Sequence, residues 1–242
     1  MPVEPLDIEG AFVVRPTQHR DARGVFMEWF TEGAFAEQAG HPLHLAQANC
    51  SVSAAGVVRG IHFADVPPGQ AKYVFCPSGA VLDVVVDIRV GSPTFGQWRS
   101  VLLDDVDRCA VYLSEGLGHA FMSLAEGSTV VYLCSTGYSP GREHGIDPRD
   151  ADLAITWPTE ERDGNPLEPL LSEKDTAAPT LAQAREQGLL PTVEQVAEQH
   201  LAGKPRIGHR SIVEMMRHRR EKHLRRIRAI AGRRQHAVHR DN

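Results

Sequence analysis

Between residues 11 and 157 the chain consists of short runs rich in β-branched and aromatic residues, separated by turns rich in Gly and Pro. The clearest apolar runs are 72–76, 80–89, 100–103, 109–113 and 128–134. Many short strands with turn signals between them are typical of a sandwich or barrel rather than of alternating strands and helices. The pattern therefore predicts a mainly β fold, with one short helix near residues 33–39.

The pattern changes after about residue 157. A polar, Pro-rich stretch is followed at 181–201 by a helical pattern that Gly188 and Pro191 interrupt. Further along, a Ser and a Glu three positions apart form a capping-box signature, which predicts a helix over about 211–231. The C-terminal part of the chain is therefore expected to be helical.

Charge also changes near the C-terminus. Residues 204–242 hold 13 Lys or Arg against 3 Asp or Glu, a net of +10, whereas the preceding residues hold 13 basic and 28 acidic residues, a net of -15. The formal net charge of -5 conceals this asymmetry, which marks a boundary. We expect one domain over 1–203, including its C-terminal helical segment, and a basic, helical or partly disordered extension over 204–242.

The role of the basic extension is open between three alternatives. It could bind a polyanion, dock onto the acidic part of its own or a neighbouring subunit, or have no role. The extension holds no aromatic residue that could stack on bases. We therefore expect neither nucleic acid nor a membrane as a partner.

Two features bear on the cellular compartment. No apolar run approaches the roughly 20 residues that span a bilayer, and the N-terminus lacks the basic and then apolar segment of a secretion signal. The four cysteines, which include no C-x-x-C pair, argue against a zinc site or a dense disulfide framework. We predict a cytoplasmic protein.

Four residues that carry chemistry lie among apolar neighbours in strand-like segments: Arg59, His62, Lys72 and Tyr132. If such side chains point inward at the strand period of two, a β-barrel can gather them in one cavity. A desolvated Lys or His there would have the shifted proton affinity that acid–base chemistry uses. The alternative is that His62 and Tyr132 are interior residues with local hydrogen bonds, and that Lys72 is a surface lysine at a strand end.

A metal site is a further alternative, because His62 and His119 could supply ligands from two strands. Metal-binding barrels usually contain a His-x-His pair, and this sequence contains none. We therefore expect no metal, with a metal-dependent barrel enzyme as the alternative.

A series of motifs, in order over residues 3–195, resembles the dTDP-4-dehydrorhamnose 3,5-epimerase family. The matching segments are 21–30, 47–51, 56–63, 67–72, 83–96, 114–121, 155–158 and 171–175. The resemblance implies a cupin-type jelly-roll barrel with peripheral helices, usually a homodimer, without metal or organic cofactor. The implied reaction inverts C3 and C5 of dTDP-4-dehydro-6-deoxy-D-glucose to give dTDP-4-dehydro-L-rhamnose.

The resemblance also implies roles for individual residues. His62 corresponds to the family's base and Asp175 to its partner carboxylate. Tyr132 corresponds to the acid that reprotonates the opposite face, and Lys72 to the cation near the C4 oxygen. Removing a proton next to a carbonyl places charge on its oxygen, so a base, an acid and an oxyanion stabiliser are the groups that this reaction requires.

Further positions correspond to nucleotide and sugar contacts: Arg23, Phe26, Glu28, Gln47, Asn49, Arg59, His119, Tyr138, Glu143 and Lys174. Arg23 and Arg59 would face the diphosphate. An alternative for Glu143 is a surface ion pair with its neighbour Arg142. The sequence departs from the family pattern at Ala120, where Gly is more common.

Two other functions remain open. The first is an epimerase that acts at C3 or C5 alone and feeds a specialised sugar pathway. The second is a sugar-nucleotide binding protein without catalysis, which would not require an opposed base and acid.

Overall fold

The computed structural model describes residues 2–202. The basic extension over 204–242, with its predicted helix over 211–231, lies outside these residues. The expectations for that part of the chain stay predictions.

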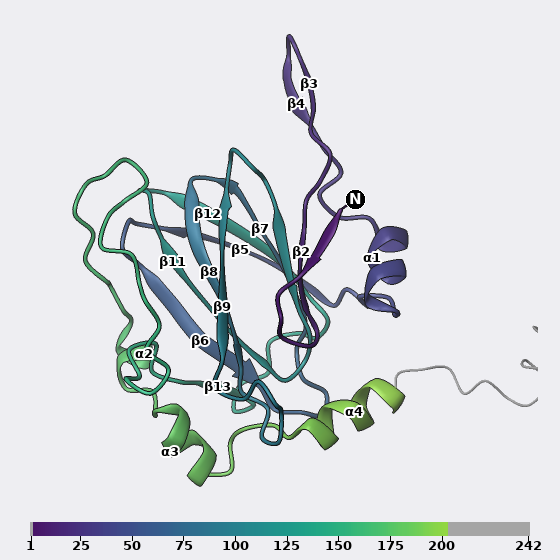
Figure 1. Cartoon of the computed structure of the whole chain (residues 1–242), viewed down its shortest axis with the longest axis vertical. Helices are drawn as coiled ribbons and strands as arrows, with labels where there is room; N and C mark the ends of the chain where they lie inside the picture. Colours follow the sequence, from purple (N-terminus) through teal and green to yellow (C-terminus); the bar gives the residue numbers. More distant parts are fainter. Residues whose placement is uncertain (1, 203–242) are drawn as a thin grey trace, which may run out of the picture. The chain divides into compact units, whose positions relative to one another are not determined.

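Two antiparallel sheets pack face to face (Figure 1). Across the six-stranded sheet the order is β1 (Val3–Pro5), β2 (Ala11–Val14), β10 (Ala110–Leu113), β7 (Lys72–Ser78), β12 (Ser128–Cys134) and β5 (Gln47–Ser53). Across the five-stranded sheet it is β13 (Glu143–Gly145), β6 (Val58–Ala64), β11 (Leu117–Ser123), β8 (Ala80–Asp87) and β9 (Trp98–Asp104). Each of the apolar runs singled out in the sequence forms a strand, so the mainly β prediction is confirmed.

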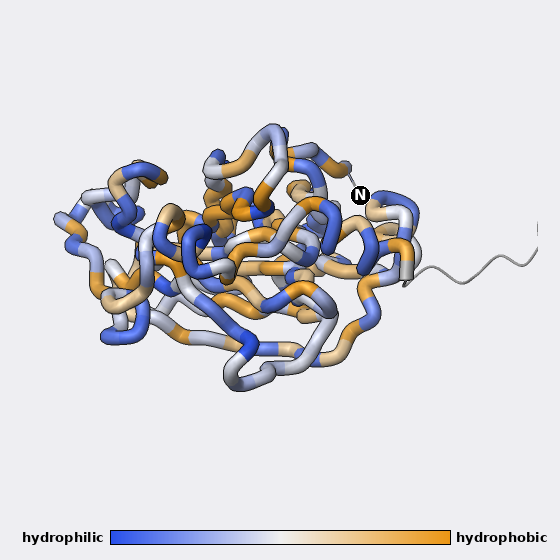
Figure 2. The backbone as a smooth tube through the Cα atoms, turned by 90° about the horizontal axis from the view of Figure 1, so that it is seen from below, coloured by the Kyte–Doolittle hydropathy of each residue, from blue (hydrophilic) through white to orange (hydrophobic). Residues whose placement is uncertain are grey.

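An apolar core fills much of the space between the sheets. Its fully buried side chains come from both sheets, for example Val74 and Val111 from one and Val85 and Leu103 from the other. We call this cluster the apolar side of the interior. Burying such a side chain contributes about 1.5–3 kcal/mol. Figure 2 shows hydrophobic residues along the central strands and hydrophilic ones in many of the peripheral loops.

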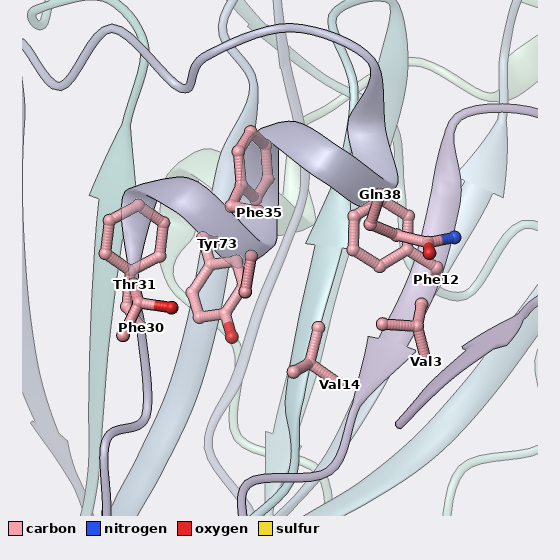
Figure 3. Close-up of a pocket in the computed structure, with 9 residues that line it drawn as sticks. Val3, Phe12, Val14, Phe30, Thr31, Phe35, Gln38 and Tyr73 are labelled. Carbon is pink, nitrogen blue, oxygen red and sulfur yellow. The ribbon is translucent and has the colours of Figure 1, made fainter. Parts of the chain in front are cut away.

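The outer face of the six-stranded sheet is covered by α1 (Glu32–Ala39), which confirms the predicted helix. Phe35 of α1 packs edge-on against Tyr112 and Tyr73. A small apolar pocket lies beneath the helix, lined by residues that include Phe12, Phe30 and Tyr73 (Figure 3). On β7, Tyr73 and the adjacent Val74 point to opposite faces of the six-stranded sheet. Val74 faces the core between the sheets, so the pocket at Tyr73 lies on the outer face and is part of the packing of α1.

The C-terminal segment forms short helices, namely α2 (Glu173–Thr176), α3 (Leu181–Glu186) and α4 (Val193–Ala202). Leu181 and Ala184 of α3 pack against the outer face of the five-stranded sheet. The chain breaks between α3 and α4 around Gly188 and Pro191, as the sequence predicted. No helix within residues 2–202 has the length and apolar character needed to cross a membrane.

A register shift between β6 and β11 decides where two candidate site residues point. His119 lies opposite His62, whereas Phe121 lies opposite Arg59, so three steps along β6 match two along β11. In a regular strand Arg59 and His62 would face opposite sides of the sheet. The β-bulge brings both toward the space between the sheets.

Gly60 makes this bulge possible. Its φ of +117° is strained for any residue with a side chain, and a Cβ would lie 2.5 Å from the His119 carbonyl oxygen. Only glycine fits this position.

Candidate active site

His62 and Asp175 form a hydrogen-bonded pair. The imidazole Nε2 lies 2.7 Å from Oδ1 of Asp175, which comes from α2 and is 113 residues away in the chain. The His62 side chain is 35% exposed and the Asp175 side chain 7%, so the imidazole is accessible while its partner is enclosed. Because Nε2–H donates to the carboxylate, Nδ1 remains available to accept a proton.

The start of α2 holds Asp175 in place. Ser172 is the N-cap, and its Oγ accepts a hydrogen bond from the Asp175 N–H at 3.1 Å and donates to Oδ2 at 2.9 Å. Burial alone would raise the pKa of Asp175, but hydrogen bonds from His62, Ser172 and the Gly60 N–H hold this pKa below its usual range. The carboxylate therefore stays ionised and orients His62.

Lys72 points into the interior from the first position of β7. It is 8% exposed, so the surface-lysine alternative is wrong. Burial lowers the pKa of the ammonium group, and the nearby charges of Glu143 and Asp83 oppose this lowering. A cation in such a water-poor setting is suited to stabilising an oxyanion.

Tyr132 lies on β12 directly opposite Asn49 of β5. Burial raises the pKa of its phenol, so the phenol is protonated at neutral pH and can donate a proton. Gln47 donates to Asn49 at 2.7 Å, and Arg59 Nε donates to Ser53 Oγ at 3.2 Å across the two sheets. These polar groups line the inner face of β5 beside Tyr132.

His119 and Asp83 form a second histidine–aspartate pair, with Nε2 2.8 Å from Oδ2. Both residues are buried, and within the described chain Oδ1 of Asp83 has no hydrogen-bond partner. The sequence reasoning assigned no role to Asp83. Asp83 could have been selected as a candidate because it is a charged residue at an inward position among the valines of β8, where an uncompensated carboxylate is costly.

Five of these residues, His62, Lys72, Asp83, His119 and Tyr132, define what we call the polar side of the interior. His119 lies opposite His62 on adjacent strands, and Asp83 contacts His119 and lies close to Lys72. The Glu143 carboxylate lies close to both Lys72 and Tyr132. The structure thus brings a histidine–carboxylate pair, a buried cation and a phenol to one region.

Other predicted contacts lie at the margin of this region. Glu143 is half-buried and accepts a hydrogen bond from the Ser139 N–H at 3.4 Å. Arg142 pairs with Asp65 instead, so the ion-pair alternative for Glu143 is wrong. Tyr138 is exposed, and its N–H donates to Gln47 Oε1 at 2.8 Å.

Lys174 lies in α2 next to Asp175 and is exposed.

Three predicted contacts lie away from the polar side. β3 (His19–Asp21) and β4 (Gly24–Phe26) form a separate hairpin that projects beyond the two sheets (Figure 1). Arg23 is at its turn, with a side chain 90% exposed, and among residues 2–202 its guanidinium pairs only with Asp21, two positions earlier. Phe26 is 67% exposed, and Glu28, which follows the hairpin, is also exposed. Within one chain these residues do not join the polar side of the interior.

The histidines of the polar side are not arranged as metal ligands. His62 and His119 are each bonded to their own aspartate. Within residues 2–202, no group of three or more His, Cys, Asp or Glu side chains could hold a metal ion.

Comparison with known proteins identifies the family. Residues 5–183 match the family model described as dTDP-4-dehydrorhamnose 3,5-epimerase. The chain belongs to the dTDP-4-dehydrorhamnose 3,5-epimerase family. One relative, the dTDP-4-dehydrorhamnose 3,5-epimerase of Mycolicibacterium smegmatis, is 57% identical over 192 residues, which are 79% of this chain and 92% of that protein. Another, the dTDP-4-dehydrorhamnose 3-epimerase of Streptomyces niveus, is 58% identical over 79% of this chain and 89% of that protein.

Solved structures of family members confirm the jelly-roll prediction. The rmlC epimerase of Mycobacterium tuberculosis superposes with a TM-score of 0.79 at 55% identity, covering 82% of this chain and 98% of that one. A 3'-monoepimerase from Streptomyces bikiniensis in complex with dTDP-quinovose gives 0.78 at 52% identity, covering 82% and 98%. The family therefore includes enzymes that act at one carbon and enzymes that act at two.

Proposed function

We propose that this family member epimerises C3 and C5 of dTDP-4-dehydro-6-deoxy-D-glucose and releases dTDP-4-dehydro-L-rhamnose. The observation that carries the proposal is the His62–Asp175 pair in the same region as a buried Lys72 and Tyr132, whose phenol pKa is raised by burial. Protons at C3 and C5 are acidic because both carbons flank the C4 ketone. A base, a cation for the enolate oxygen and an acid are the groups that such an exchange requires.

The roles of the four residues follow from their settings. His62 takes the proton at Nδ1, and Asp175 stabilises the imidazolium that results. Lys72 stabilises the negative charge that develops on the C4 oxygen. Tyr132 returns a proton from the other face of the sugar, which inverts the carbon.

Exchange in deuterated water tests the reaction directly. When the enzyme is incubated with the keto sugar in deuterated water, we expect NMR to locate deuterium at both C3 and C5. Label at one carbon only would favour a monofunctional enzyme, an alternative that the 58% identical 3-epimerase relative makes specific. Absence of label at both carbons would favour a binding protein.

The assignment of Tyr132 has its own test. Tyr132→Phe removes the proton donor but leaves His62, so deuterium uptake should survive better than net epimerisation. Full turnover of this variant would contradict the assignment. Asn49→Ala, which removes the neighbour of Tyr132 but keeps the phenol, is the matched control and should reduce turnover less.

We further propose a homodimer in which each hairpin of β3 and β4 completes the site of the other subunit. The exposed Arg23 and Phe26 support this, because residues suited to diphosphate and base contacts otherwise face solvent. The remaining predicted contacts, Glu28, Gln47, Asn49, Arg59, His119, Tyr138, Glu143 and Lys174, would then surround the nucleotide and sugar from two subunits.

Mixing two inactive variants tests the shared site. In a mixed dimer of Arg23→Ala and His62→Ala subunits, one site receives an intact Arg23 and an intact His62. Refolding the two together should restore about a quarter of wild-type turnover if subunits pair at random. No recovery in a mixture shown to contain mixed dimers would contradict the shared site.

A further inference from the structure

Glu115 is a mostly buried carboxylate that the proposed chemistry does not use. It lies in the turn between β10 and β11, with 13% of its side chain exposed. Oε1 accepts a hydrogen bond from Ser135 Oγ at 3.0 Å, and Oε2 lies 3.1 Å from Nε2 of His200 on α4. Through these two hydrogen bonds the buried carboxylate connects the turn to the end of β12 and to α4.

Ser135 connects Glu115 to the strand that carries Lys72. Its Oγ accepts from the Ala71 N–H at 2.8 Å, and its own N–H donates to the Ala71 carbonyl at 3.0 Å. Ala71 immediately precedes Lys72 at the start of β7. Two consecutive hydrogen bonds, followed by the Ala71–Lys72 peptide bond, therefore lead from Glu115 to the backbone of Lys72.

The turn before Ala71 also packs on Glu115. Gly69 has a φ of +72°, and a Cβ there would lie 2.7 Å from the Glu115 Cβ. The Gly69 carbonyl accepts from Thr136 Oγ1 at 2.8 Å. The segment that precedes β7 is thus held by hydrogen bonds with Ser135 and Thr136 and by packing against the aliphatic part of the Glu115 side chain.

The Glu115 carboxylate is ionised in this setting. Burial alone would raise the pKa of Glu115, but the hydrogen bonds from His200 and Ser135 contribute to holding it below its usual range. A charged acceptor makes shorter and stronger hydrogen bonds than a neutral one. Ser135 is therefore held firmly in the orientation that binds Ala71.

We propose that Glu115 is a positioning residue for Lys72: together with His200 it anchors Ser135, which holds the start of β7 so that the Lys72 ammonium meets the enolate oxygen. The proposal rests on the proposed function, in which Lys72 stabilises that oxygen. Displacing a catalytic group by about 1 Å can cost up to 100-fold in rate, so a remote anchor can affect turnover.

Two single variants and a double-mutant cycle test this role. Glu115→Ala and Ser135→Ala should each lower kcat about tenfold while KM changes less than twofold, because ground-state binding is retained. In a Lys72→Met background, neither change should lower kcat further, since the group that they position is absent. If Glu115→Ala does not fold, Ser135→Ala carries the same test.

Asp105→Asn is the matched control. Asp105 holds the turn at the other end of β7, accepting from the Gly79 N–H at 2.9 Å and from Arg162 Nη1 at 2.8 Å. Asp105→Asn should reduce thermal stability about as much as Ser135→Ala does, but it should leave kcat unchanged. Equal losses of kcat in Asp105→Asn and Ser135→Ala would overturn the proposal, because they would indicate a general loss of rigidity.

The results separate this proposal from the function on which it rests. Additive losses of kcat, with Lys72→Met itself strongly impaired, would overturn the role of Glu115 alone. Wild-type turnover in Lys72→Met would overturn the role of Lys72, and with it the role of Glu115, while the epimerase activity itself would stand.

Discussion

The polar and apolar sides of the interior are formed by the same strands with the same alternation of side chains. On β7, Lys72 and Val74 are two residues apart and face the same space, and on β12 so do Tyr132 and Val130. The valines are fully buried and need no partner. The polar residues require hydrogen bonds and compensating charges, which come from Asp175 of α2 and from Asp83 and Glu143 on strands β8 and β13. The barrel therefore provides stability on one side and chemistry on the other.

The largest effect that we expect is the loss of activity on replacing His62, a residue of the polar side. His62→Asn should lower deuterium exchange at both carbons by about 10⁴-fold, because the variant lacks the base that Asp175 orients. Its stability should change by less than about 1 kcal/mol, since the imidazole is partly exposed. Exchange rates by NMR and urea unfolding measure the two quantities. Wild-type exchange in His62→Asn would contradict the base assignment.

Lys72→Met should separate activity from stability. We expect kcat to fall by about 10²- to 10³-fold, as when an oxyanion donor is lost. The unfolding free energy should stay equal or rise by about 1 kcal/mol, because an apolar side chain replaces a buried cation. Urea titration and steady-state kinetics on the same preparation check both. A variant that loses stability and activity together would show that Lys72 is structural.

Leu103→Ala is the reverse experiment on the apolar side. Leu103 on β9 is fully buried, so its truncation should cost about 2–5 kcal/mol of unfolding free energy. The kcat of the folded fraction should remain within twofold of wild type, because Leu103 belongs to the apolar cluster. A loss of kcat beyond that would show that the two sides are coupled.

The effect of acid on the unfolding free energy should also differ between the two sides. The pKa of Asp175 is held below its usual range, so its ionised form stabilises the fold above the unfolded-state pKa of about 3.9. That contribution is lost as the pH falls through the lower folded-state value. The stability difference between wild type and Asp175→Asn, about 1–2 kcal/mol at pH 5, should shrink toward pH 3. The difference for Leu103→Ala should not depend on pH over this range.

The smallest expected effect concerns the basic extension. Deleting residues 204–242 should leave kcat and the unfolding free energy close to wild type, because the family match ends at residue 183 and every proposed site residue precedes it. Enzyme assays and thermal melts on the shortened chain check this. A large loss of turnover would assign the extension a part in the reaction.

Much of the fold could be predicted from local patterns. Strands β7, β8, β9, β10 and β12 could be predicted from β-branched residues between Gly and Pro turns, and α1, α3 and α4 from helical spacing and breaks. His62, Lys72 and Tyr132 could be selected as candidates because polar groups among apolar neighbours are costly and need a reason. The pairing of His62 with Asp175 came from resemblance, since no local pattern links residues 113 positions apart.

What the sequence by itself determined is the mainly β class, the segments of β7, β8, β9, β10 and β12 and the residue types that they carry, because side-chain alternation and turn preference are local properties of the chain. What only the tertiary structure decided is how those residues meet. The bulge at Gly60 turns Arg59 and His62 to one side, Asp83 joins His119 across strands, and the hairpin holds Arg23 away from the polar side of the interior. Each depends on register between distant strands, and a shift of one residue reverses which face a side chain occupies.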